Sequence, residues 1–152
     1  MAENWPSKPI RAFIPFGAGS ATDIVPRTVF DALAAELGQP IIVENRGGAG
    51  GTIGVGAVVR AEPDGYTVLA NSSAHAIAPW IVPNVPYDTA KDLSCVLMIG
   101  QNANVMIVLP SKGWKTAQDF ATAAKAKPGS INYGSAGLGT SKKVFTRWGR
   151  SG

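Results

Sequence analysis

The chain is 152 residues long, enough for one ordinary domain, and its 45% of apolar residues predicts a packed core rather than disorder. Its net charge of +4 comes from basic residues scattered singly along the chain, except for the group Lys142, Lys143, Arg147 and Arg150. No basic stripe runs along a face, so nucleic acid is not an expected partner. No apolar run approaches the roughly 20 residues of a membrane span, and the first residues lack the pattern of a signal peptide.

Strand and helix signals alternate through the first half of the chain. Residues 10–16 predict a strand that is ended by glycines, and a helix follows through Leu37 with Asp23 as its N-cap. Residues 40–44 predict a second strand, 52–60 a helix of small residues, and 66–70 a third strand. The first helix is expected to turn one apolar face to the core, made of Ile24, Thr28, Ala32, Leu33, Ala35 and Leu37.

The signals of the second half are weaker. Residues 71–75 predict a polar loop, and prolines 79, 83 and 86 predict an irregular region after it. Strands are expected at 96–99, 105–109 and 131–133, and a helix at 116–126 ended by Pro128. The single cysteine, Cys95, lies in an apolar run and is expected to be a buried thiol rather than a nucleophile.

This order of elements predicts an α/β fold with a parallel sheet, in which ligands bind at the loops after the carboxyl ends of strands. Three loops qualify, residues 17–23, 71–75 and 134–141; all contain hydroxyl residues, and the first and third are also rich in glycine. Such loops suit backbone N–H groups that hold an anion. For residues 17–23 the alternative, a simple turn into a helix, stays open on sequence chemistry alone.

Motifs for other chemistry are incomplete. Residues 134–141 have the spacing of a phosphate-binding P-loop, but Thr140 occupies the lysine position. The glycine-rich turn at 47–56 has Ile53 where a dinucleotide fold needs its third glycine, which favours a tight turn. His75 is the only histidine, so neither a metal site nor a catalytic serine paired with a base is indicated.

Several motifs in order resemble the receptors of tripartite tricarboxylate transporters, the Bug family of periplasmic binding proteins. They are Trp5 to Arg11 with Pro15-Phe16, Val43 to Arg46 with Gly48 to Gly51, Pro63 to Thr67, Pro86 to Asp92, and Ala124 to Gly129 with Asn132 to Ser135. The second resembles the family's VENRPGAGG turn, with Gly47 in place of proline. The resemblance covers residues 5 to 141 and implies a two-lobed, type II periplasmic-binding-protein-like fold that closes on a ligand.

The resemblance also implies the residues of the binding site. The family loop FAPGGATD, which holds a ligand carboxylate through backbone amides and ordered waters, maps onto residues 16–23. Ala18 stands there in place of proline and Ser20 in place of glycine, while Asp23 is expected to cap the helix rather than contact an anion. The implied ligand-binding set is Phe16, Gly17, Ala18, Gly19, Ser20, Ala21, Asp23, Ser72, Ser73, His75, Ser135, Ala136, Thr140 and Ser141.

The end of the chain departs from the family pattern after Ser141. We therefore expect a first lobe at residues 1–102, the incomplete start of a second lobe at 103–141 and a divergent tail at 142–152. A missing cleft wall is expected to weaken ligand binding, and the apolar surface left exposed is expected to drive dimerisation.

The function implied is extracytoplasmic capture of a small di- or tricarboxylate, or an aromatic carboxylate, without catalysis, cofactor or metal. The implied partners are the membrane transporter subunits or a sensor, and the implied location is the periplasm. Two alternatives remain open. One is the effector-binding domain of a regulator, for which no helix-turn-helix precedes Ile10, and the other is a nucleotide-binding enzyme, against which the absent P-loop lysine argues.

Overall fold

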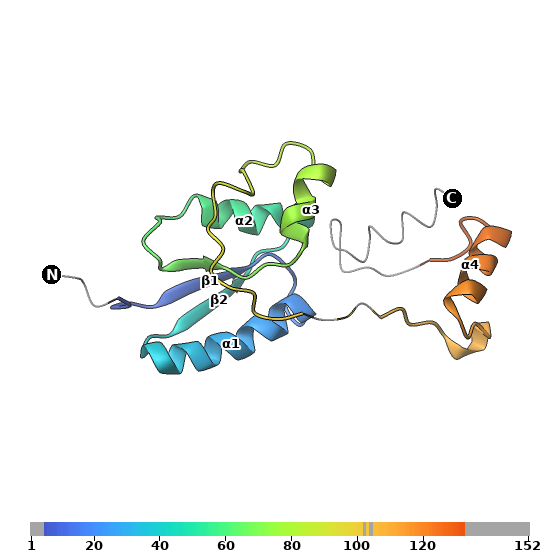
Figure 1. Ribbon diagram of the computed structural model, residues 1–152, viewed down its shortest axis with the longest axis horizontal. Coiled ribbons are helices and arrows are strands. Elements are labelled where there is room, and N and C mark those ends of the chain that lie inside the picture. Colours follow the sequence, from blue (N-terminus) through green and yellow to red (C-terminus); the bar gives the residue numbers. More distant parts are fainter. Residues whose placement is uncertain (1–4, 102, 104, 133–152) are drawn as a thin grey trace.

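The computed structural model describes residues 5–101, 103 and 105–132, and its centre is a parallel sheet of three strands (Figure 1). The strands are β1 (Ile10–Ile14), β2 (Ile41–Asn45) and β3 (Thr67–Leu69), in the spatial order β2-β1-β3. Ile10 is in register with Ile41, and Arg11 with Thr67. The first strand is therefore the central one, and it is almost entirely buried. The predicted parallel α/β architecture is confirmed.

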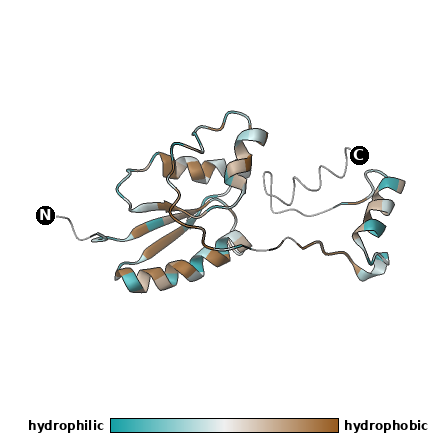
Figure 2. Cartoon of the chain, viewed as in Figure 1, coloured by the Kyte–Doolittle hydropathy of each residue, from teal (hydrophilic) through white to brown (hydrophobic). Residues whose placement is uncertain are grey.

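Helices cover both faces of this sheet. Figure 1 shows α1 (Ala21–Leu37) on one side and α2 (Thr52–Val59) on the other. A core cluster joins the strands to the helices through Ala12, Ile14, Phe16, Phe30, Ala70 and Ala74. Figure 2 shows that hydrophobic residues concentrate along the strands, which is the pattern of strands buried between two helical layers.

The first helix differs from its predicted form in start and orientation. It begins at Ala21 with Ser20 as N-cap, so Asp23 lies inside the first turn and is not the cap. Its buried residues are Asp23, Pro26 and Phe30, one stripe at helical spacing. The predicted apolar face was wrong, since Ile24 and Leu33 are exposed. Phe30 supplies the packing, and Asp23 is buried because polar groups of neighbouring elements surround it.

Close packing joins α2 to the ends of the first two strands. A short 3-10 helix, η1 (Ala49–Gly51), leads into α2 and contains Gly50 in a left-handed conformation. Gly54, in the first half of α2, lies against the chain that follows β1. A Cβ atom placed there would be 2.6 Å from the Arg46 carbonyl oxygen and 2.9 Å from Cβ of Pro15. Only a residue without a side chain allows this approach.

The region after β3 is more helical than expected. Residues 74–81 form a helix, α3 (Ala74–Ile81), which buries Ala74 and Ala78 although it contains Pro79. The prediction of a loop reaching residue 75 followed by irregular chain was therefore wrong. Pro79 cannot donate to the His75 carbonyl, so α3 forms with one helical hydrogen bond fewer.

The predicted strands at 96–99 and 105–109 do not form in the described part of the chain. These residues are extended chain without a sheet partner, and most of their side chains are exposed. Cys95 is exposed as well, so the expectation of a buried thiol was wrong. A second 3-10 helix, η2 (Pro110–Lys112), and α4 (Ala117–Ala126) follow, and Figure 1 shows α4 apart from the sheet. The predicted strand at 131–133 is absent at 131–132, and residue 133 lies outside the described residues.

A capping box fixes the start of α4. The Asp119 amide donates to Oγ1 of Thr116 over 3.1 Å, and Oδ2 of Asp119 accepts from the Thr116 amide over 2.9 Å. We expect Thr116→Ala to destabilise α4 by about 1 kcal/mol, because the Asp119 amide in the first turn loses its side-chain acceptor. Hydrogen exchange of the amides at 119–123 measures this loss. Thr122→Ala, in the exposed middle of the same helix, should not raise exchange, and equal changes in the two variants would contradict the capping account.

Candidate functional site

Three connections meet at the carboxyl edge of the sheet, and each leads into a helix. Residues 15–20 join β1 to α1, residues 46–51 join β2 to α2 through η1, and residues 70–73 join β3 to α3. η1 packs against both α2 and α3. In Figure 1 the amino ends of α1 and α3 lie at this same edge. Helix amino ends carry free N–H groups and a partial positive charge, so this edge favours an anion.

A buried carboxylate organises the first of these connections. Asp23 is 3% exposed, and its Oδ2 accepts from the Gly19 amide over 2.7 Å. Its Oδ1 accepts from Nδ2 of Asn45 and Nε of Arg27, both over 2.8 Å. Asn45 also donates to the Phe16 carbonyl over 3.0 Å, and Nη2 of Arg27 donates to Oδ1 of Asn45 over 2.7 Å. The network ties the loop after β1 to α1 and to the end of β2.

The electrostatic consequence is a carboxylate that stays ionised in a buried position. Hydrogen bonds from Asn45 and Gly19, followed by the bond and charge of Arg27, hold the pKa of Asp23 below its ordinary value although burial acts to raise it. The Arg27 guanidinium offsets the negative charge locally. An anion at the loop surface therefore meets helix N–H groups and not an unpaired carboxylate.

The remaining predicted residues of this loop are placed as follows. Phe16 is buried, and Gly17, Ala18, Gly19 and Ala21 are exposed. The Gly19 amide already donates to Asp23, so it is not free for a ligand. Among the described residues, Oγ of Ser20 is a buried oxygen without a hydrogen-bond partner, at the amino end of α1. Ala21 is the first residue of that helix, where N–H groups lack intrahelical acceptors.

The loop after β3 is held by its own polar groups. The Ser72 amide donates to Oδ1 of Asn71 over 2.8 Å, and Oγ of Ser72 accepts from the Ala74 amide over 3.3 Å. Ser73 is exposed at the N-cap of α3. Both serines thus lie at a helix start, as anion binding needs.

The His75 side chain contacts a later part of the chain. Its Nε2 lies 3.3 Å from the Thr89 carbonyl oxygen, and its ring stacks on Tyr87 with 6.0 Å between centroids. Burial raises the pKa of the Tyr87 hydroxyl. The arrangement packs α3 against the segment that follows it, and it gives neither serine a base.

The third predicted loop cannot be placed. Ser135, Ala136, Thr140 and Ser141 lie outside the described residues. Within the described ranges, no three His, Cys, Asp or Glu side chains gather at a distance suited to a metal ion, and no helix there is long and apolar enough to cross a membrane.

Sequence reasoning missed Asn45, Arg27 and Thr52 as organisers of this edge. Asn45 is the polar last residue of β2, and Arg27 is four residues after Asp23, a spacing that pairs charges on a helix. These signals were present, but only the fold shows that both side chains reach one carboxylate. Thr52 is buried at the start of α2, where its hydroxyl donates to the Ala49 carbonyl over 2.9 Å.

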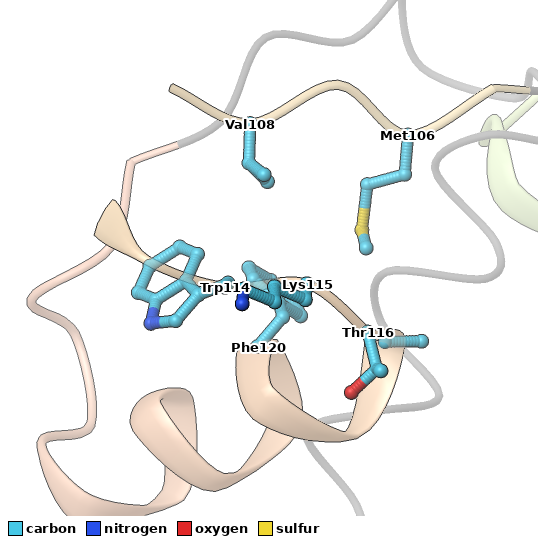
Figure 3. Close-up of a pocket in the computed structure, with 7 residues that line it drawn as sticks. Met106, Val108, Trp114, Lys115, Thr116 and Phe120 are labelled. Atoms are coloured by element: carbon cyan, nitrogen blue, oxygen red, sulfur yellow. The ribbon is translucent and has the colours of Figure 1, made fainter. Parts of the chain in front are cut away.

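A separate hollow lies between the extended segment 105–109 and α4. Figure 3 shows Met106 and Val108 directed toward Trp114 and Phe120, and the space between them is about 190 Å³. The Trp114 and Phe120 rings meet edge to face at 5.6 Å. Most of the residues that line it are apolar, so it is better suited to core packing than to an anion.

Comparison with known proteins gives concordant matches. A family model described as tripartite tricarboxylate transporter family receptor matches residues 25–147. BugT of Bordetella pertussis is 34% identical over 147 residues, which are 95% of this chain and 45% of BugT. The chain therefore spans about half the length of the curated relatives it matches.

Two solved structures carry ligands. Rpa4515 of R. palustris with adipate is 28% identical with a TM-score of 0.85, over 93% of this chain and 49% of that one. MatC (Rpa3494) from Rhodopseudomonas palustris with bound malate is 26% identical with a TM-score of 0.76, over 96% and 51%. The periplasmic-binding-protein-like fold class is confirmed. The matched proteins are substrate-binding receptors and not enzymes, as the sequence predicted.

Proposed function

Because the chain belongs to the tripartite tricarboxylate transporter receptor family, we propose that it binds a small organic carboxylate at the carboxyl edge of its sheet. The observation that carries this proposal is the meeting of helix amino ends at that edge, in a fold whose solved relatives hold adipate and malate. We further propose that the ligand is delivered to a membrane transporter and that capture occurs in the periplasm, as the family name and the relatives' descriptions support.

The proposed mechanism is reversible binding, without a covalent step. The N–H groups at the start of α1 and the exposed Ser73 hydroxyl at the start of α3 take the place of water around the ligand carboxylate. The Asp23 network holds the loop after β1 in one shape, so little conformational entropy is lost when the anion binds.

The test is calorimetric titration of the 152-residue chain with adipate, malate and citrate. Ala21→Glu places a carboxylate at the exposed first position of α1, where it stabilises the helix but repels an anion. We expect it to weaken binding at least about tenfold, the scale of like charges a few ångströms apart near a protein surface. The unfolding free energy should be unchanged or slightly raised.

The matched control is Ala32→Glu, which adds the same charge in the exposed middle of the same helix. It should leave carboxylate affinity within about twofold. Heat that never saturates with any acid, while circular dichroism shows an intact fold, would contradict the proposed function. Equal weakening in both variants would place the anion elsewhere than the start of α1.

A further inference from the structure

The turn at residues 86–92 has no part in the carboxylate site as proposed above, yet its own polar groups hold it in one shape. Oδ1 of Asp88 accepts from the Ala90 amide over 2.9 Å, and Oδ2 of Asp88 pairs with Nζ of Lys91 over 3.0 Å. The Asp88 amide donates to Oδ2 of Asp92 over 2.8 Å, and the Asp92 amide donates to the Asp88 carbonyl over 3.0 Å. An aspartate that binds amides of its own loop in this way stabilises the loop locally.

Two groups of this turn contact the first turn of α3 through His75. Nε2 of His75 lies 3.3 Å from the Thr89 carbonyl oxygen, and a carbonyl only accepts, so Nε2 carries the ring proton. The imidazole also stacks on the Tyr87 ring, with 6.0 Å between centroids and 11° between planes. The Tyr87 hydroxyl oxygen is buried without a hydrogen-bond partner among the described residues. The ring of Tyr87, and not its hydroxyl, therefore makes the contact.

The helix α3 depends on contacts of this kind for its position. It has eight residues, fewer than the roughly 12 that an isolated helix needs to be even marginally stable. Its N-cap, Ser73, makes no side-chain cap bond, and Pro79 lacks an amide donor. Its buried side chains are only the small ones of Ala74 and Ala78. Lateral contacts such as the His75 pair must therefore fix the direction of its first turn.

We infer that the turn 86–92 is a brace for the amino end of α3, in which His75 and Tyr87 are positioning residues for carboxylate binding and not ligand contacts. The effect on affinity rests on the proposed function, because the amino end of α3 is one side of the proposed site (Figure 1). A helix end that is fixed before the anion arrives loses little conformational entropy on binding. Without the brace, part of the binding free energy is spent on ordering that end.

The first test is Tyr87→Ala in the full 152-residue chain, which removes the stacked ring. Hydrogen exchange at amides 75–78 should become about three- to tenfold faster without any ligand. Affinity for the acid that wild type binds among adipate, malate and citrate should weaken by the same factor, which corresponds to the usual strength of an aromatic pair. Tyr87→Phe keeps the ring and removes the buried hydroxyl, so both values should stay within about twofold of wild type.

A second, milder variant leaves the stacked rings in place. Asp88→Ala removes a carboxylate that is 44% exposed and that holds the turn through the Ala90 amide and Lys91. Exchange at amides 75–78 should become about two- to fivefold faster, because the Thr89 carbonyl is then less well fixed. Unchanged exchange in both Tyr87→Ala and Asp88→Ala would overturn the brace.

The matched control is Trp80→Ala, which removes an aromatic side chain that is 87% exposed near the other end of the same helix. It should leave exchange at amides 75–78 and carboxylate affinity within about twofold of wild type, and an effect equal to that of Tyr87→Ala would overturn the inference. Nitrogen NMR of His75, the only histidine, should show the Nε2–H tautomer in wild type and in Tyr87→Phe. The opposite tautomer would exclude the bond to Thr89.

A double-mutant cycle separates positioning from direct contact with the ligand. If His75 acts through Tyr87, the variant carrying both His75→Ala and Tyr87→Ala should bind no more weakly than the weaker single variant. Additive losses of affinity would show that His75 contacts the ligand itself, and they would overturn the positioning role. If wild type binds none of the three acids, the carboxylate proposal fails, and the exchange measurements alone decide whether the brace exists.

Discussion

Asp23→Ala is expected to lower the free energy of unfolding by about 3 kcal/mol. The substitution removes the buried acceptor that the Gly19 amide, Asn45 and Arg27 share in the described structure, and it breaks the part-buried network that joins the loop to β2. Urea unfolding at pH 7 measures the change. Asp31→Ala in the same helix removes an exposed carboxylate and should stay within about 0.5 kcal/mol of wild type.

The same carboxylate predicts how stability depends on pH. Because the folded-state pKa of Asp23 lies below its ordinary value of 3.8, its stabilisation is fully present above that value. It is lost as pH falls through the folded-state pKa. The stability difference between wild type and Asp23→Asn should therefore be large at pH 7 and shrink below pH 3.8. A difference that stays constant between these conditions would show that the ionised form does not hold the loop.

Gly54→Ala is expected to destabilise the protein by about 2 to 3 kcal/mol, although alanine favours helices. The new Cβ would lie 2.6 Å from the Arg46 carbonyl oxygen and 3.1 Å from Cα of Pro15, and neither backbone atom can move without shifting a strand end. The overpacking cost exceeds the gain of about 1 kcal/mol in helix propensity. Urea unfolding and the chemical shifts of the turn at 46–51 measure the effect.

Gly56→Ala is the matched control, because it makes the same change two residues later in the same helix. A Cβ there meets Nη1 of Arg60 at 3.4 Å and Cγ of Pro86 at 3.8 Å, which are ordinary contacts with movable groups. This variant should gain about 0.5 to 1 kcal/mol. If both variants change stability in the same direction, the close approach at Gly54 does not control the packing of α2.

Local signals predicted the elements of the first seventy or so residues well. The positions of glycine and proline predicted the ends of β1, β2 and β3 to within about two residues of where they lie in the structure. The run of small residues predicted α2. The order of these elements also predicts which connections follow the strands, and it predicts the edge of the sheet at which the amino ends of the helices meet. The edge at which we propose anion binding could therefore be predicted from the sequence.

The failures came where tertiary contacts overrode local pattern. Asp23 is buried because two side chains bind it: Asn45 at the end of β2, and Arg27 one turn further along α1. The face of α1 that was predicted to be buried is therefore exposed. The apolar runs around Val96 and Ile107 were predicted as strands on composition, but a strand needs a neighbour. Pro79 was expected to keep this region irregular, but α3 forms with Pro79 inside it.

The strand order also sets the order of events during synthesis. β1 leaves the ribosome first, yet its two neighbours are β2 and β3, and the second of these is not complete until Leu69 has been made. The most buried strand must therefore wait, with Phe13 and Ile14 uncovered, while α1 and α2 form locally and quickly. Folding of this unit is therefore expected to be limited by closure of long loops, and nascent chains that do not yet include β3 are expected to be the species that chaperones hold.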